Sequence, residues 1–166
     1  MSKKRKVAVF IIAAFIACTL AFIWGNSVMT AKQSEESSGR VYETVKSALD
    51  AVFGENVVPI THNFTRKAAH FSEFALLGAE LSALFIALKK ESVKGYAEIL
   101  PCGLFVAAVD EGLQFLSDRG PSLVDVAIDF SGCLAVAAVF FVVFLIRRKR
   151  KNGVSREKRE IGRAHV

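Results

Sequence analysis

The chain has 166 residues, enough for one domain, and 52% of them are hydrophobic, including 14 phenylalanines. A net charge of +6 would suit nucleic acid in a soluble protein. Here, however, the basic residues form short clusters beside long apolar runs, as the topology signals of membrane proteins do. The composition therefore argues against a soluble domain and a nucleic-acid partner. It predicts an all-α, four-span transmembrane helix bundle.

The first predicted span covers residues 7–24 and follows a basic N-terminus at residues 1–6. This arrangement resembles a signal peptide. The apolar run is longer than a usual signal-peptide core, however, and no good small-x-small cleavage site follows it. Trp24 suits an interfacial anchor at the far end. We therefore predict that the segment is an uncleaved span.

The loop of residues 25–65 is polar, contains no span and carries one predicted amphipathic helix. Ser37 or Ser38 would cap the start of this helix, and Gly54 would end it. A helix on the membrane surface is the favoured interpretation, and a helix packed on neighbouring loops stays open as the alternative. The apolar residues at helical spacing are Val41, Val45, Ala48, Leu49, Val52 and Phe53.

Three more spans are predicted over about residues 68–88, 95–116 and 123–146, the second of them with Pro101 near its start. Basic residues cluster before the first span, in the 89–94 loop and in the tail of residues 147–160. The positive-inside rule therefore places both termini in the cytoplasm and the 25–65 loop outside.

The last six residues, 161–166, match the translation of a common sequencing adapter. We expect this segment to be non-native, and His165 is excluded from functional reasoning for that reason.

Ionisable residues recur near one end of the second, third and fourth predicted spans. A charged side chain at the centre of a span costs about 2.5–3.5 kcal/mol, so such residues are functional candidates by default. The predicted topology places nearly all of them in the outer halves of their spans, and Glu80 alone lies deeper. The predicted polar cluster comprises Arg66, Lys67, His70, Glu73, Asp110, Glu111, Gln114, Arg119, Asp125 and Asp129.

Helical spacing places members of this cluster on shared faces. Arg66, His70 and Glu73 stand at i, i+4 and i+7, and the acids of the other two spans share faces in the same way. Gly78 and Gly132 would let the helix backbones approach closely. The pattern predicts a bundle with a polar pocket that opens outward.

A purely structural interpretation of these charges stays open. Arg66 could pair with Glu73, and Arg119 with Asp125 or Asp129, and such ion pairs would only fix the register of the helices.

A metal site and a disulfide framework have weaker support. His70 and Glu73 could ligate a divalent cation, but this is a weak signal because the spans contain a single histidine, and no cofactor is predicted. Cys18, Cys102 and Cys133 lie apart in apolar runs, which favours neither a disulfide framework nor a metal site.

Three linked motifs resemble the VanZ family of bacterial membrane proteins over about residues 65–135. The resemblance implies a multi-pass protein of the bacterial cytoplasmic membrane. The family's namesake is associated with resistance to the glycopeptide teicoplanin, and the family offers no agreed catalytic residues. The matching residues are Arg66–Phe74 with Leu77 and Gly78, Asp110–Phe115, and Arg119–Ser122 with Asp125, Val126, Asp129 and Gly132.

Three functions follow as hypotheses. The first is a cell-envelope protein that binds an anionic lipid-linked or glycopeptide ligand at the outer leaflet, where Arg66 and Arg119 would contact the anion. The second is an enzyme on a lipid-linked envelope substrate that uses His70 and Glu73. The third is a small transporter or proton relay, although four spans are few for a carrier. The sequence names neither the ligand nor the oligomeric state.

Overall fold

The computed structural model describes residues 1–55, 57–117 and 120–164, with side chains described as far as residue 153. These segments contain five α-helices and no strand, so the all-α prediction is confirmed. The helices are α1 (Lys3–Ser27), α2 (Ala31–Phe53), α3 (His62–Ala87), α4 (Val93–Phe115) and α5 (Leu123–Ala164).

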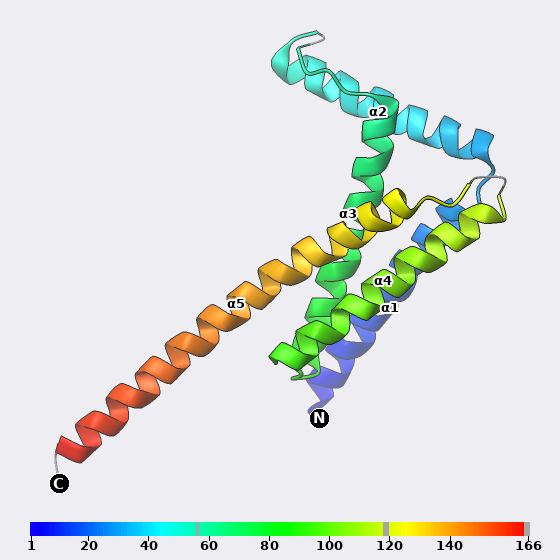
Figure 1. Ribbon diagram of the computed structural model, residues 1–166. Helices are drawn as coiled ribbons and strands as arrows, with labels where there is room; N and C mark the ends of the chain where they lie inside the picture. The colour runs from blue at the N-terminus through cyan, green and yellow to red at the C-terminus, as the bar shows by residue number, and fades with distance from the viewer. Residues whose placement is uncertain (56, 118–119, 165–166) are drawn as a thin grey trace.

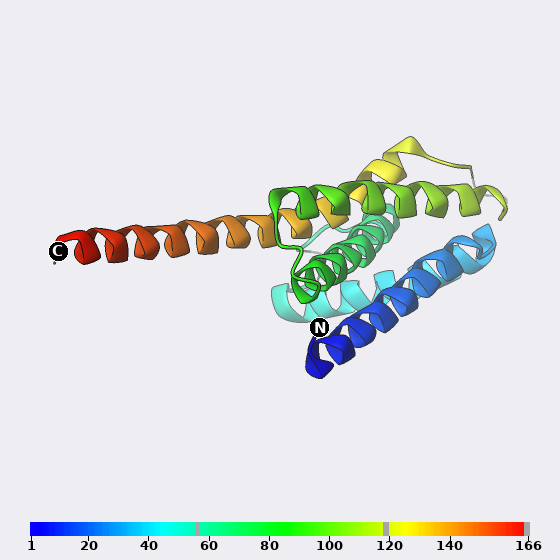
Figure 2. The same cartoon turned by 90° about the horizontal axis from the view of Figure 1, so that it is seen from below.

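Helix α3 lies at the centre of the fold. It contacts each of the other four helices, and its longest interface is with α5. Helix α2 lies across one end of the bundle, over the start of α3, while α5 continues well beyond the other helices toward the C-terminus (Figures 1 and 2). We call the end of the bundle that carries α2 the α2 end; there α1 and α4 finish and α3 and α5 begin.

Hydrogen bonds between helices show how the two ends of the bundle are built. The Arg5 side chain near the start of α1 donates to the carbonyl of Ala87, the last residue of α3. At the α2 end, Ser27 of α1 donates to Asp110 of α4. Helices α1 and α4 therefore run in the same direction, and α3 runs opposite to both.

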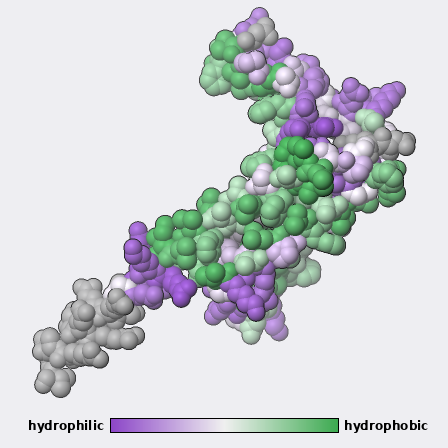
Figure 3. Space-filling view, viewed as in Figure 1, coloured by the Kyte–Doolittle hydropathy of each residue, from purple (hydrophilic) through white to green (hydrophobic). Residues whose placement is uncertain are grey.

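Three helices are long and apolar enough to cross a membrane, namely α1, α3 and the Leu123–Gly153 part of α5. They contain most or all of the predicted spans 7–24, 68–88 and 123–146. Helix α4 has 23 residues and continues through Pro101, but Glu98, Asp110 and Glu111 reduce its apolar character. Length and composition therefore establish three candidate spans. They do not establish α4, which corresponds to the predicted span 95–116, as a fourth. In Figure 3 a hydrophobic band covers the middle of the bundle, with hydrophilic residues toward both ends.

One predicted helix start was wrong, and another helix begins earlier than the membrane span predicted within it. Helix α2 begins after Thr30 because a capping box holds it there: the Thr30 hydroxyl accepts from the Gln33 N–H at 3.3 Å, and the Gln33 side chain accepts from the Thr30 N–H at 3.1 Å. Ser37 and Ser38 lie inside the helix, whereas Gly54 does end it, with φ 96°. Helix α3 begins at His62, well before residue 68, because the Thr61 hydroxyl accepts from the Phe64 N–H at 3.2 Å.

The α3–α5 interface depends on two glycines. A Cβ built on Gly78 would lie 2.5 Å from the carbonyl oxygen of Cys133, and a Cβ on Gly132 would overlap the carbonyl oxygen of Phe71. Only glycine allows this backbone approach without a shift of the helices. The apolar core that follows along these helices includes Phe74, which is fully buried.

Candidate functional site

Polar residues are buried together at the α2 end of the bundle. Asp110 and Asp129 are each 0% exposed and Glu111 is 3% exposed. Burying an acidic side chain beside the apolar core costs free energy unless the acid is hydrogen-bonded, paired with a cation or neutralised by a proton. The partners of each acid therefore indicate what it does.

Asp110 joins α1 to α4. One carboxylate oxygen accepts a hydrogen bond from the Ser27 hydroxyl, and the other accepts from the Gln114 amide at 3.3 Å. The Ser117 hydroxyl closes the same junction, because it donates to the carbonyl of Ser27 at 3.0 Å. These bonds hold the ends of α1 and α4 together.

Glu111 joins α4 to the start of α5. The Gln114 amide donates to one of its oxygens at 2.7 Å, and the N–H of Ser122 donates to the other at 2.7 Å. Because Ser122 directly precedes α5, this carboxylate fixes where α5 enters the bundle. Asp110 and Glu111 are thus hydrogen-bonded acids with an evident role in packing.

Asp129 differs from these two acids. Its carboxylate is fully buried, yet neither oxygen forms a hydrogen bond within the described part of the chain. The imidazole of His70 on α3 faces it, with Nδ1 3.6 Å from Asp129 Oδ1. One turn earlier on α5, the half-buried Asp125 pairs with Lys67 at 3.8 Å. Two ionisable pairs therefore connect α3 to α5 at this end.

Two open cavities adjoin this polar end. The larger, of about 590 Å³, lies between α2 and α3 and is called the α2–α3 cavity. The smaller, of about 330 Å³, lies among α1, α2 and α3 and is called the three-helix cavity; its wall includes Asn26, His70 and Glu73. Both are lined by Arg66, Ser34 and Ser38. The two cavities therefore share one cationic side chain.

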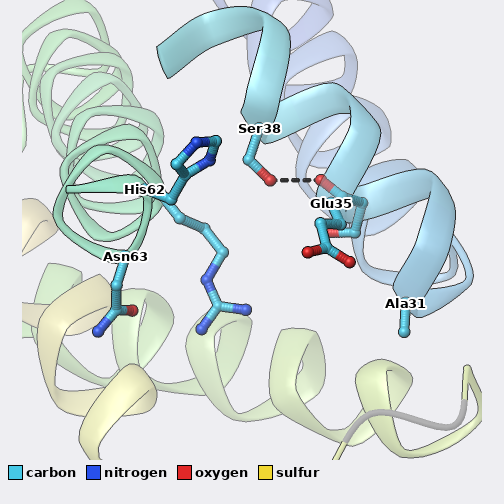
Figure 4. Close-up of a pocket in the computed structure, with 7 residues that line it drawn as sticks. Ala31, Glu35, Ser38, His62 and Asn63 are labelled. Carbon is cyan, nitrogen blue, oxygen red and sulfur yellow. Dashed lines mark hydrogen bonds between the residues drawn. The ribbon is translucent and has the colours of Figure 1, made fainter. Parts of the chain in front are cut away.

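Figure 4 shows the α2–α3 cavity from close by. Glu35 and Ser38 of α2 line one wall, and His62 and Asn63 at the start of α3 line the other. The Ser38 hydroxyl donates to the carbonyl of Ser34 (Figure 4). Cationic and anionic side chains both reach this cavity, because Arg66 and Glu35 line it together.

One group of side chains has the composition and spacing of a metal site. Each of His70, Asp110 and Asp129 offers a ligand atom, and these atoms lie within 4.8 Å of one another. Of the two residues named as metal candidates from the sequence, His70 belongs to this group and Glu73 does not. Glu73 instead contacts Asn26 of α1 through a side-chain hydrogen bond.

The structure gathers most of the predicted polar cluster around the junction of α3, α4 and α5. A small cavity there is lined by eight residues from these helices, including Lys67, Gln114 and Asp125. Glu80 lies apart and accepts a hydrogen bond from Thr19 of α1 at 2.9 Å. Arg119, by contrast, lies outside the described residues.

Of the ion pairs considered from the sequence, Arg66 with Glu73 is not observed among the described residues, and the pairs of Arg119 lie outside them. The observed pairs join Lys67 to Asp125 and His70 to Asp129. Both connect helices far apart in sequence, so spacing within α3 could not reveal them.

Sequence reasoning also missed the contribution of α1. Ser27 and Asn26, near the end of that helix, contact Asp110 and Glu73, and Thr19 contacts Glu80. The available signal was the presence of small polar residues in an otherwise apolar span, because such residues usually serve as hydrogen-bond partners between helices.

Comparison with known proteins identifies a family. Residues 9–146 match the family described as VanZ/LLP1, which covers well over half of the chain. No curated relative and no solved structure matches the chain significantly.

Proposed function

The chain belongs to the VanZ/LLP1 family, and from this premise we propose that it binds an anionic head group at the outer face of the bacterial cytoplasmic membrane. The ligand class is a membrane lipid or a lipid-linked envelope component with a phosphate or carboxylate group. Arg66, which lines both cavities, is the residue that binds this anion.

The proposal includes a topology with four spans, both termini in the cytoplasm and α2 outside. This topology is supported by the directions of the helices, because α1 and α4 run the same way and α3 runs opposite to both. The basic residues at the start of α1, after α3 and at the end of the apolar part of α5 support the orientation. In this topology the α2–α3 cavity lies at the level of the outer head groups.

The observation that carries the proposal is the position and bonding of the Arg66 side chain. Its side chain is half-buried and lines both cavities, but no hydrogen bond or ion pair joins it to another described residue. Its guanidinium is always charged and presents donors that match phosphate and carboxylate oxygens. An arginine that lines a cavity and has no carboxylate partner among the described residues is well placed to bind an external anion.

The walls around Arg66 support the same ligand class. The start of α3 lies at the α2–α3 cavity through His62 and Asn63, and a helix N-terminus favours negative charge. Ser34 and Ser38 add hydroxyl groups from α2. Glu35 on the same wall would repel an anion, so we place the anionic group on the Arg66 side of the cavity.

Two single substitutions in the same cavity test the proposal. The purified protein in nanodiscs of phosphatidylcholine with increasing phosphatidylglycerol is examined by native mass spectrometry for retained anionic lipid. We expect Arg66→Gln to lower the retention of anionic lipid at least about tenfold. This corresponds to the loss of one charge-assisted contact that contributes about 1.4 kcal/mol or more to binding.

Glu35→Gln is the matched control, because it removes a charge from the facing wall of the same cavity. We expect it to leave retention of the anionic lipid unchanged or to raise it. Equal losses in the two variants would mean that the cavity was disturbed in general. Unchanged retention in Arg66→Gln would overturn the proposal.

A role in teicoplanin tolerance follows as a narrower form of the same proposal. Teicoplanin carries a lipid tail, so a protein that acts at the outer leaflet can alter its effect there. The test is the minimal inhibitory concentration for a susceptible bacterial host with the wild type, Arg66→Gln, Arg119→Ala or an empty vector. Tolerance that needs the arginines supports the role, and equal values for wild type and vector would remove it for this chain.

An enzyme on a lipid-linked substrate is the second candidate, because His70 and Glu73 line the same three-helix cavity as Arg66. Such a pair can transfer a proton at a substrate held by the arginine. The test incubates the protein with a bacterial lipid extract and compares products by mass spectrometry. A product formed by the wild type and not by His70→Gln, with head-group retention intact, would favour the enzyme.

A further inference from the structure

Three acids are buried at the α2 end of the bundle, namely Asp110, Glu111 and Asp129. Asp110 and Glu111 accept hydrogen bonds from side chains and backbone around them. Asp129 accepts none within the described residues, and it faces His70, whose side chain is 21% exposed. A fully buried carboxylate of this kind needs compensation by a proton or by a bound cation.

We propose that His70, Asp110 and Asp129 bind one divalent transition-metal cation, Zn²⁺ or Mn²⁺, at the junction of α3, α4 and α5. The inference goes beyond the proposed function, because it rests on these three side chains and does not require a head group at Arg66. One imidazole nitrogen with two carboxylate oxygens is a donor set that suits these cations.

The first support is the geometry of the donor atoms. The three ligand atoms lie within 4.8 Å of one another, and His70 Nδ1 lies 3.6 Å from Asp129 Oδ1. Ligands about 2.1 Å from a tetrahedral ion are about 3.4 Å apart. The His70–Asp129 separation is thus long for a hydrogen bond but close to the distance between two ligands of one ion.

The second support is the state of Asp129. It is 0% exposed, and neither oxygen forms a hydrogen bond within the described residues. Asp110 and Glu111, at the same level, accept hydrogen bonds from Ser27, Gln114 and Ser122. A buried carboxylate with two unused oxygens, directed toward an imidazole, is the arrangement that a metal ligand requires.

The third support is space. A cavity of about 10 Å³ borders two of the three proposed ligands, His70 and Asp129, and it is also lined by Glu111 and Gln114 and by the cationic residues Arg66 and Lys67. This is about the room needed for one water molecule or one small ion. Hydrogen bonds from Ser27 and Gln114 also fix the Asp110 carboxylate, as outer partners of metal ligands commonly do.

The test measures metal content and affinity in the full chain. The protein is purified in mild detergent without chelator, and zinc and manganese are counted per chain by inductively coupled plasma mass spectrometry. After treatment with EDTA, Mn²⁺ is titrated as the probe and followed by electron paramagnetic resonance. We expect about one ion per chain in the wild type and a coupling of Mn²⁺ to a histidine nitrogen.

Asp129→Asn and Asp125→Asn form a matched pair, because both remove one carboxylate from the same face of α5. We expect Asp129→Asn to weaken Mn²⁺ binding at least about 100-fold, more than the loss of an outer partner of a metal ligand does. Asp125→Asn should keep affinity within about threefold, because Asp125 pairs with Lys67. Equal losses in both variants would mean binding to surface acids and would overturn the proposal.

The wild type decides the question even if Asp129→Asn fails to fold. Less than about one ion per ten chains, with no change of Tm on addition of Zn²⁺ or Mn²⁺, would mean that protons neutralise the acids, and the metal site would be wrong. Head-group retention by the EDTA-treated protein is measured in parallel. A loss of metal binding without a loss of retention, or the reverse, shows which of the two proposals has failed.

Discussion

The Nδ1 atom of His70 on α3 lies 3.6 Å from Oδ1 of Asp129 on α5, and the Asp129 carboxylate is completely buried. This contact lies at the α2 end of the longest helix interface in the fold. Farther from the α2 end along the same interface, Gly132 packs against the carbonyl of Phe71 and Gly78 packs against the backbone of Cys133. The most extensive helix interface thus ends in an ionisable pair.

A double-mutant cycle measures how strongly this pair is coupled. In the presence of EDTA, we expect the effects of His70→Ala and Asp129→Ala on the free energy of unfolding to be non-additive by about 1–2 kcal/mol, because the two groups share one contact. The measurement is unfolding by denaturant in mixed micelles. The partly exposed pair Lys67–Asp125 is the control and should couple by about 0.5 kcal/mol or less. Additive effects at His70 and Asp129 would show that the contact has no energetic value.

The close approach of α3 and α5 predicts the effect of one added methyl group. In Gly132→Ala the new Cβ would overlap the backbone of Phe71, so the helices must move apart. We expect a loss of about 1–3 kcal/mol of stability and a lower Tm. Gly112→Ala on α4 is the control, because no heavy atom lies within 4 Å of its Cβ position. Alanine there should leave stability unchanged or raise it.

The hydrogen bonds of Gln114 predict a second loss of stability. Its amide donates to both Asp110 and Glu111, and Gln114→Leu would remove one donor from each of these two buried carboxylates, which would keep only their bonds from Ser27 and Ser122 among those described here. We expect a cost of about 2–4 kcal/mol in the same unfolding experiment. Ser131→Ala serves as the control, because that exposed hydroxyl donates only within its own helix, to Ile128 at 2.6 Å. A change below about 0.5 kcal/mol in Gln114→Leu would contradict a packing role for these acids.

Much of this architecture could be predicted because apolar length and helical spacing are local properties. The segments around residues 7–24, 68–88 and 123–146 are long and apolar, and the structure has a membrane-length helix at each. The spacing of Arg66, His70 and Glu73 predicted a common face, and all three line the three-helix cavity. Such patterns can be recognised in the sequence of a single helix, without knowledge of its neighbours.

The remainder depends on contacts between distant segments. Nothing in the sequence distinguishes Asp110, which accepts from Ser27 of α1, from Asp129, which accepts no hydrogen bond in the described chain. The difference arises from which helices pack together. The start of α2 was missed for a local reason, since the Thr30–Gln33 capping box lies ahead of the apolar periodicity used to find the helix.

Cysteine labelling tests whether α4 is the fourth span. The turn before α4 and the segment after it each offer an exposed position, Glu91 and Gly120. In a background without the native cysteines, we expect an impermeant maleimide to label Gly120→Cys in intact spheroplasts. Glu91→Cys should react only after permeabilisation, because α4 would separate the two residues. Glu43→Cys on α2 should behave like Gly120→Cys.

The possible outcomes separate the span count from the orientation. Labelling of Glu91→Cys and Gly120→Cys from the same side would mean that α4 does not cross the membrane. In that case the buried acids Asp110 and Glu111 would belong to a helix that enters the bilayer only in part. Opposite sides with the order reversed would keep four spans but place α2 in the cytoplasm. The Arg66 cavities would then face cytoplasmic ligands, and a role at the outer leaflet would be wrong.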